Sequence, residues 1–264
     1  MVFSTITGCA LLQPGYLTLT PSTPTIARQG EIRTFGTVSL NHLEGQIAGS
    51  PLPHLTLLAN GYTGNGTRSH ELGIGGYARM GKSLLVDAAV FTTKARINNT
   101  DTMTTFSIFG MGTDIGVVKA EYGGLALQTN ISYGDFEREK TWKPTLSAGF
   151  KMHFVTYDHY HHFRGYEARV GGFTRGKSWT MPDFMKSEQF YTISVTCRAG
   201  DERFGVMAQF AFHNAVGRYK PGFIDNGPGY KLFWLTTGVE MYFGPNNKKN
   251  KNRAKPVKNI SPTG

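Results

Sequence analysis

The 264-residue sequence predicts an all-β fold: an antiparallel transmembrane up-and-down β-barrel of about ten strands, with its long loops on one side. Three observations predict it: apolar and polar residues alternate with period two, the alternating segments are about ten residues long, and turns and long loops sort to opposite ends. Segments of this length suit tilted strands that cross a hydrocarbon layer, since ordinary strands average five or six residues. Alternation by itself is also typical of a soluble sandwich or a lipocalin-like barrel.

Ten segments alternate in this way, and no internal segment has helical spacing. Their expected bounds are 31–40, 43–50, 54–62, 68–80, 83–95, 117–132, 143–157, 188–199, 203–213 and 230–243. Short turns fall at one end, at 51–53, 81–82, 133–142 and 200–202, and the other end receives 41–42, 63–67, 96–116, 158–187 and 214–229. The segments 104–116 and 164–174 could pair as hairpins within the long loops, so eight or twelve strands also stay open.

The alternation divides each strand into two faces of different chemistry. One face is apolar, as in Leu72, Ile74 and Met80. The other face carries His153 and charges of balanced sign, which are Arg33, Arg79, Lys151 and Arg198 against Glu44, Glu71, Asp87 and Glu240. Because a buried charge without a partner is costly, we expect ion pairs across the lumen that fill the interior. We expect Arg33 and Arg198 to lie nearer the water-exposed rims.

The net charge of +10 is concentrated in the last 21 residues. Six basic residues and no acidic residue lie in 244–264, and without them the chain has 22 basic and 18 acidic residues. A short Asn/Lys/Pro tail of this kind is typical of a solvated extension, so the charge does not predict a nucleic-acid partner. The expected organisation is a lipoprotein-signal remnant at 1–8, a lipidated Pro/Thr-rich linker at 9–29, the barrel at 30–243 and a basic, disordered periplasmic tail at 244–264.

Two short motifs bear on export and assembly. The run Ile6-Thr7-Gly8-Cys9 is similar to a bacterial lipobox, in which the cysteine is acylated, although no basic region or full apolar region precedes it. The last strand contains Gly238, Met241 and Phe243 at the spacing of the β-signal that the barrel-assembly machinery recognises. The 21-residue tail departs from that pattern, because such signals usually end the chain.

Residues 8–62 resemble the start of uncharacterised outer-membrane β-barrel lipoproteins of the Bacteroidetes. The resemblance rests on the lipobox cysteine, a Pro-rich linker, Gly30-Glu31 before the first strand, and Gln46 in the next. It continues through Ser50-Pro51-x-x-His54, Leu-x-Leu, Asn-Gly-Tyr and the Glu-Leu-Gly-x-Gly segment that begins at Glu71. It implies a barrel fold and the bacterial cell outer membrane, and it implies no particular activity.

Two other motifs suggest chemistry. Gly76 to Ser83 satisfies the GxxxxGK[ST] pattern of phosphate-binding loops, but alternating strands flank it, so a tight hairpin explains the same residues. Asp158 and His159 could activate water at a barrel rim, and His159, His161 and His162 are weak candidate metal ligands. No cysteine or glutamate completes a recognised metal spacing there, and no nucleophile motif occurs, so we expect no catalytic residue, no metal and no cofactor.

The sequence therefore predicts a non-enzymatic outer-membrane barrel lipoprotein, a structural or accessory component of an outer-membrane complex. Its outer loops are expected to bind a partner or a glycan. Expected partners are outer-membrane lipid, the barrel-assembly machinery during biogenesis and a larger protein complex. The alternatives are an outer-membrane hydrolase with a rim site near Asp158 and His159, a narrow pore, or a soluble ligand carrier.

Overall fold

The computed structural model describes residues 21, 25–38, 42–64, 66–107, 110–136, 143–168, 174–180, 187–201, 203–216 and 233–244. No helix in this part of the chain is long and apolar enough to cross a membrane. The strands are β1 (Ile32–Val38), β2 (His42–Gly49), β3 (Leu55–Gly64), β4 (Thr67–Met80), β5 (Leu84–Ser107), β6 (Gly110–Gly134), β7 (Lys143–Ala168), β8 (Thr174–Thr180), β9 (Ser187–Gly200), β10 (Phe204–Ala215) and β11 (Phe233–Phe243).

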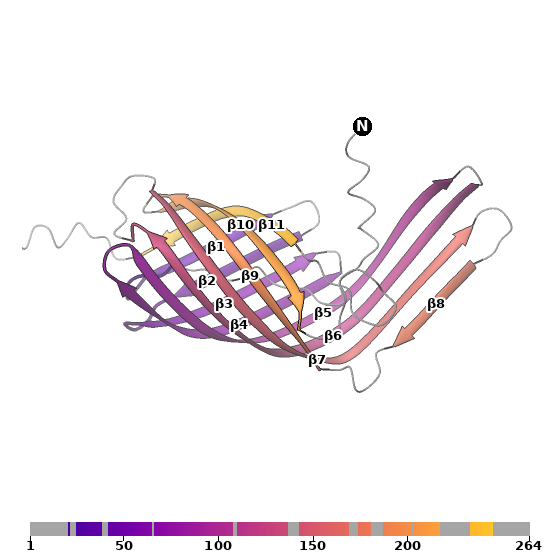
Figure 1. The fold of residues 1–264 in the computed structure, drawn as a ribbon, viewed down its shortest axis with the longest axis horizontal. Helices are drawn as coiled ribbons and strands as arrows, with labels where there is room; N and C mark the ends of the chain where they lie inside the picture. The colour runs from indigo at the N-terminus through magenta and orange to yellow at the C-terminus, as the bar shows by residue number, and fades with distance from the viewer. Residues whose placement is uncertain are drawn as a thin grey trace, which may run out of the picture.

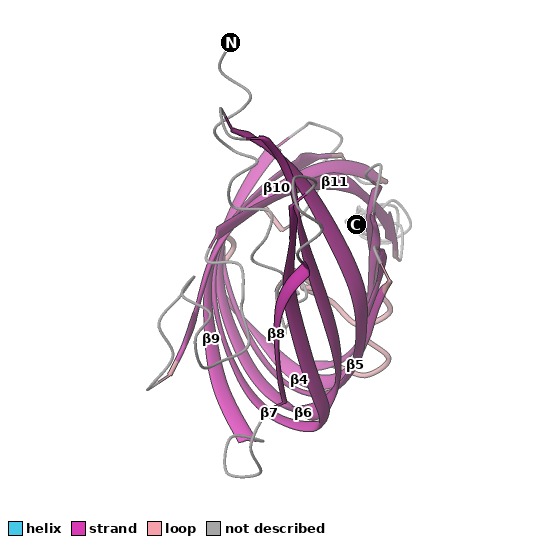
Figure 2. Cartoon of the chain, turned by 90° about the vertical axis from the view of Figure 1, so that its right-hand side faces the viewer, coloured by secondary structure: helices cyan, strands magenta, loops and turns pink. Residues whose placement is uncertain are grey.

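Ten of these strands close into a barrel, which confirms the predicted fold. Strands β1 to β7 pair antiparallel in chain order, β7 then pairs with β9, and β9, β10 and β11 follow. The register of β1 with β11, from Ile32↔Phe243 to Gly36↔Val239, closes the circle. Figure 1 shows the tilted wall from the side, and Figure 2 views it from one end.

Apolar side chains cover the outside of the barrel and polar side chains face its interior. Successive side chains of a strand point to opposite faces, so each predicted apolar face turns outward as a unit. Exposed side chains of this face include Leu72, Ile74, Leu125, Leu127, Ile131, Leu146, Phe150, Ile193, Val195, Val206, Phe210, Leu235 and Val239. This is the reverse of a soluble protein, in which the large apolar residues are buried.

The GxxxxGK[ST] segment forms the β4–β5 hairpin. Strand β4 ends at Met80, β5 begins at Leu84, and Gly81 between them has φ of +67°. Arg79 donates from Nε to the Gly81 carbonyl at 3.0 Å and from Nη2 to the Lys82 carbonyl at 3.3 Å. The predicted hairpin is therefore confirmed: a strand, and not a helix, follows the motif.

The segments expected as loops at 96–116 and 158–187 contain long strands, which corrects the predicted strand bounds and agrees with the alternative that hairpins form within these loops. Beyond Ile97, β5 leaves β4 and continues with β6 as far as the pair Ser107↔Gly110, while β7 continues beyond Thr156 with β6 and β8. We call this projecting sheet the wing: residues 98–107 of β5, 110–119 of β6, 159–168 of β7 and all of β8 (Figure 1). Its sequence lacks the apolar alternation that identified the barrel strands, and its Thr-rich run 100–105 favours β structure through side-chain branching instead.

Candidate functional site in the barrel interior

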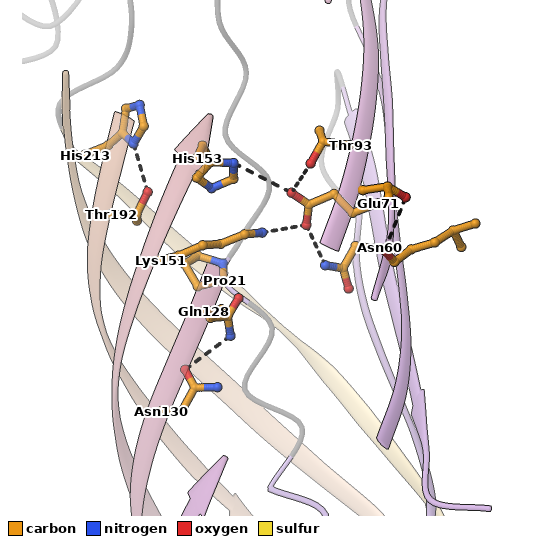
Figure 3. Close-up of polar contacts among 12 residues, drawn as sticks. Pro21, Asn60, Glu71, Thr93, Gln128, Asn130, Lys151, His153, Thr192 and His213 are labelled. Carbon is orange, nitrogen blue, oxygen red and sulfur yellow. Dashed lines mark hydrogen bonds and ion pairs between the residues drawn. The ribbon is translucent and has the colours of Figure 1, made fainter. Parts of the chain in front are cut away.

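Glu71 of β4 is the centre of a buried polar cluster in the lumen (Figure 3). Its carboxylate accepts hydrogen bonds from Lys151 Nζ at 2.5 Å, Asn60 Nδ2 at 2.9 Å and Thr93 Oγ1 at 3.2 Å. The register places Asn60 directly opposite Glu71 on β3, and Thr93 opposite it on β5. Lys151 belongs to β7, two strands beyond β5 in the wall, so this contact spans the interior.

Lys151 and Glu71 are both 0% exposed, so each charge depends on the other. The Lys151 ammonium also lies over the Phe91 ring, 4.7 Å from its centroid, in a cation–π contact. His153 follows on the same face of β7, and its Nδ1 lies 4.0 Å from Glu71 Oε1. Such pairing offsets the large cost of removing two ions from water. The arrangement fixes β4 and β7 relative to each other across the lumen.

A second cluster lies where β1, β9 and β11 meet the interior. Glu240 accepts from Arg33 Nη1 at 3.3 Å, and Arg198 Nε lies 3.3 Å from its other carboxylate oxygen. Arg33 also stacks against Tyr242, at 5.4 Å from the ring centroid. Both guanidinium groups are buried, so the expectation that Arg33 and Arg198 are exposed to water is wrong, although both lie within two residues of the short-turn end of their strands. Because both guanidinium groups contact the Glu240 carboxylate, the burial of these two charges is tolerated.

The other interior charges have different surroundings. Glu44 is buried and lies opposite Tyr62 in the β2–β3 register. Asp87 accepts from Asn130 Nδ2 at 2.5 Å, while Arg79 binds the carbonyls of its own hairpin at the rim. Of the eight charges assigned to the lumen, five therefore take part in the two clusters, and three lie at separate positions.

Part of the expected linker lies inside the barrel. Pro21, Thr25, Ile26 and Ala27 are all buried. The Pro21 carbonyl accepts from Gln209 Nε2 at 3.2 Å, and Gln209 is a fully buried, inward-facing residue of β10. Figure 3 places Pro21 beside Lys151 and Gln128 in the lumen. The chain thus enters its own barrel before it begins β1.

The predicted assembly residues lie on the last strand. Met241 and Phe243 project outward, and Gly238 faces inward between Thr236 and Glu240. A Cβ on Gly238 would lie 2.4 Å from the Gly36 carbonyl oxygen and 2.6 Å from the Phe35 ring. Packing against β1 therefore requires glycine at this position. Cys9 and the tail beyond Gly244 lie outside the described residues.

The Asp/His segment lies where β7 enters the wing. The β6–β7 register shifts between Glu121 and Tyr122, and Asp158 is the extra residue. Asp158 and His159 are exposed, His161 is half-buried, and the side chain of His162 is outside the described part. Among the described residues, no three His, Cys, Asp or Glu side chains lie close enough together to hold a metal ion.

Several site residues were missed by sequence reasoning, namely Asn60, Thr93, Gln209 and Ile26. The first three share the inward face of their strands with predicted charges, so that periodicity could have identified them. Ile26 lies in a segment without periodicity and gave no such signal. No protein-family model matches the chain, and no curated protein is significantly similar to it.

Proposed function

We propose that this chain is a non-enzymatic β-barrel protein of a bacterial outer membrane, related to the barrel lipoproteins that its first quarter resembles. The observation that carries the proposal is the inverted distribution of polarity: an apolar outer wall encloses ion pairs and amides. Lipid would cover the outer wall, so that its apolar side chains would not be exposed to water. In a closed barrel the backbone N–H and C=O groups of the wall are hydrogen-bonded between neighbouring strands. Outer-membrane barrels of single bacterial chains likewise have an even number of antiparallel strands.

Aromatic side chains support the same proposal. Tyr133, Phe204 and Phe243 project outward at the end with the short turns, and Phe154 and Tyr191 project outward toward the wing. From Leu146 to Phe154 of β7 the strand spans roughly 26 Å, or about 20 Å along the axis at the usual tilt. This is close to the roughly 25 Å apolar band between aromatic girdles in outer-membrane barrels.

The wing supports a role in binding a partner protein. Among the described residues, β8 pairs with β7 alone, and β5 has no second neighbour beyond Ile97. Each of these edges presents backbone N–H and C=O groups that can pair with a strand of another chain. The wing lies opposite the short turns, on the side that faces outward in such barrels. An acylated Cys9 would add a second membrane anchor.

Membrane insertion can be tested with the full chain expressed in a Gram-negative host. We expect the protein in the outer-membrane fraction, soluble only in detergent, with faster migration in SDS gels before boiling than after it. Recovery in the soluble fraction without detergent would refute the proposal.

The partner-binding role needs a separate comparison. The full chain and a variant with 98–118 replaced by a short turn are extracted in mild detergent from native membranes. We expect both to keep the heat-dependent gel shift, and a companion protein to copurify with the full chain alone. Identical copurifying proteins would contradict a role for the wing.

A further inference from the structure

Exposed basic side chains gather on the outer face of the barrel, at the wing end of the four neighbouring strands β4 to β7. We call this set the basic patch: Arg68, His70, Lys94, Lys119 and His159. Arg96 lies among them and is paired with Glu121 at 2.9 Å. The other exposed acidic residue at this level of the four strands is Asp158. The fixed charges of the patch, on one arginine and two lysines, therefore exceed the nearby negative charge.

Strand pairing brings positive groups close together in this part of the wall. Arg68 lies directly opposite Arg96 in the β4–β5 register. In the same register His70 lies directly opposite Lys94. Residues in such positions have Cβ atoms about 4.5–5.5 Å apart, and like charges there, such as the two arginines, destabilise a sheet. An anion bound from outside the chain would offset this repulsion.

The basic patch begins where the apolar outer face ends. On β4, His70 is two residues from Leu72, and both side chains are exposed on the same face. Two residues span roughly 7 Å along a strand. A basic residue on the lipid face is costly within the hydrocarbon layer and tolerated at its edge, so in a membrane this edge would lie between Leu72 and the patch. The cations would then lie at the level of the lipid head groups.

The same four strands end differently on the side of the short turns. Their outermost outward-facing side chains there are Met80, Leu84, Tyr133 and Leu146. These residues are apolar or aromatic, as at the interfacial girdle of a barrel. Among the described residues of β4 to β7, the outward-facing cations thus all lie at the wing end.

The surroundings of the patch identify the chemistry that fits it. Phosphate groups accept charge-assisted hydrogen bonds from arginine and lysine. A phosphorylated lipid can make these contacts while its acyl chains cover Leu72 and Leu125, which are exposed beside the patch. Arg68 and Lys119 lie two strands apart in the wall, which is roughly 10 Å, so the patch is wide enough to contact more than one phosphate group.

We propose that the basic patch binds the phosphate groups of lipids in the leaflet on the wing side. The acyl chains of the same lipids lie against the apolar wall next to the patch. This inference rests on the proposed membrane-spanning function and adds a specific lipid contact to it.

Native mass spectrometry of the full chain in detergent tests the patch. Lipid A is the phosphorylated probe, and dephosphorylated lipid A is the control ligand. The test variant combines Arg68→Gln, Lys94→Gln and Lys119→Gln. We expect its affinity for lipid A to fall by at least about tenfold, because each surface cation contributes severalfold to the binding of an anionic head group. Its affinity for dephosphorylated lipid A should equal that of the unsubstituted chain.

The matched control variant combines Arg28→Gln, Lys82→Gln and Arg203→Gln, which remove the same charge at the end with the short turns. It should keep its affinity for lipid A within about twofold of the unsubstituted chain. Equal losses in the two variants would reveal a diffuse charge effect and overturn the inference, and so would an unchanged affinity of the patch variant. Displacement of lipid A by excess inorganic phosphate would assign the patch to free phosphate and overturn it as well.

The heat-dependent gel shift first establishes that each variant is folded. If the combined patch variant lacks the shift, Arg68→Gln and Lys119→Gln are measured singly, and each should lose at least about threefold in affinity. Unchanged affinity of both single variants would overturn the inference equally. Recovery of the unsubstituted chain in the soluble fraction without detergent would count against the proposed function instead.

Discussion

Glu71 shows how a single residue can organise the interior. Its carboxylate receives three hydrogen bonds, from strands on both sides of it and from Lys151 across the lumen. A carboxylate without access to water needs such donors to remain ionised at tolerable cost. Glu71 and Lys151 offset each other's charge, so the burial of either group is tolerated only while its partner is present.

Lys151→Met should destabilise the barrel by about 3–5 kcal/mol, because it leaves the Glu71 charge buried without its cation. Lys151→Met combined with Glu71→Gln should lose much less, since both charges disappear together. Urea unfolding of the protein in lipid vesicles, followed by the gel shift, measures both. The control is Arg96→Met, which breaks an exposed pair with Glu121 at 2.9 Å and should cost at most about 1 kcal/mol. Equal losses for Lys151→Met and Arg96→Met would contradict this account.

Gly238 makes a second residue-scale prediction. Gly238→Ala should destabilise the β1–β11 contact by about 1–3 kcal/mol, because the added methyl group would overlap the Gly36 carbonyl and the Phe35 ring. Gly61→Ala is the matched control, since a Cβ there meets no atom within 4 Å. Both are measured by the same unfolding assay. A larger loss for Gly61→Ala would show that close packing is not what Gly238 provides.

At the scale of strands, the sequence predicts what depends on alternation and misses what does not. Strand β4 was expected at 68–80 and spans Thr67–Met80, because its outer face is apolar and its inner face polar. The wing portion of β5 from Asn98 to Ser107 was expected as a loop, with a hairpin left open only for 104–116, because its sequence is mostly polar and does not alternate. Hydropathy alternates along a strand only where its two faces meet different surroundings. Strand pairing beyond the apolar part of the wall therefore gives no hydropathy signal.

The sequence also did not predict which residues contact each other across the lumen. Periodicity placed Glu71 and Lys151 on the inner face, but their partnership depends on closure and tilt, which bring together residues 80 apart in the chain. Residues 25–30, which lie before β1, show no hydropathy period at all. Their insertion follows from the apolar patch that Leu58, Leu85 and Phe91 form only in the closed barrel.

Two outer-face residues of β6 lie at different depths in the wall, so they test whether lipid surrounds it. Leu127→Arg, at mid-wall, should cost about 2–4 kcal/mol in a bilayer, and Tyr133→Arg, at the rim, about 0–1 kcal/mol. Both side chains are exposed on the outer face, so a difference between them reports the surrounding lipid. Unfolding free energies in vesicles give the measurement. If the two substitutions had the same small effect, water and not lipid would surround the wall.

At the scale of the whole molecule, closure depends on strands from opposite ends of the chain. The β1–β11 seam has five residue pairs, fewer than β1 forms with β2 or β10 with β11. It joins residues about 200 positions apart, so the entropy of loop closure opposes it most. We therefore expect the seam to form last and to be the most sensitive part of the wall.

Val239→Pro tests that expectation. Val239 lies between Gly36 of β1 and Val206 of β10, and proline removes its N–H from a strand that has neighbours on both sides. The variant should lose the fast-migrating form in unboiled SDS gels and become sensitive to added protease. Thr104→Pro is the comparison, because Thr104 pairs with Thr113 in the wing, outside the closed wall, and should leave the fast-migrating form intact. If Val239→Pro kept the gel shift while Thr104→Pro abolished it, closure would depend on the wing and not on the seam.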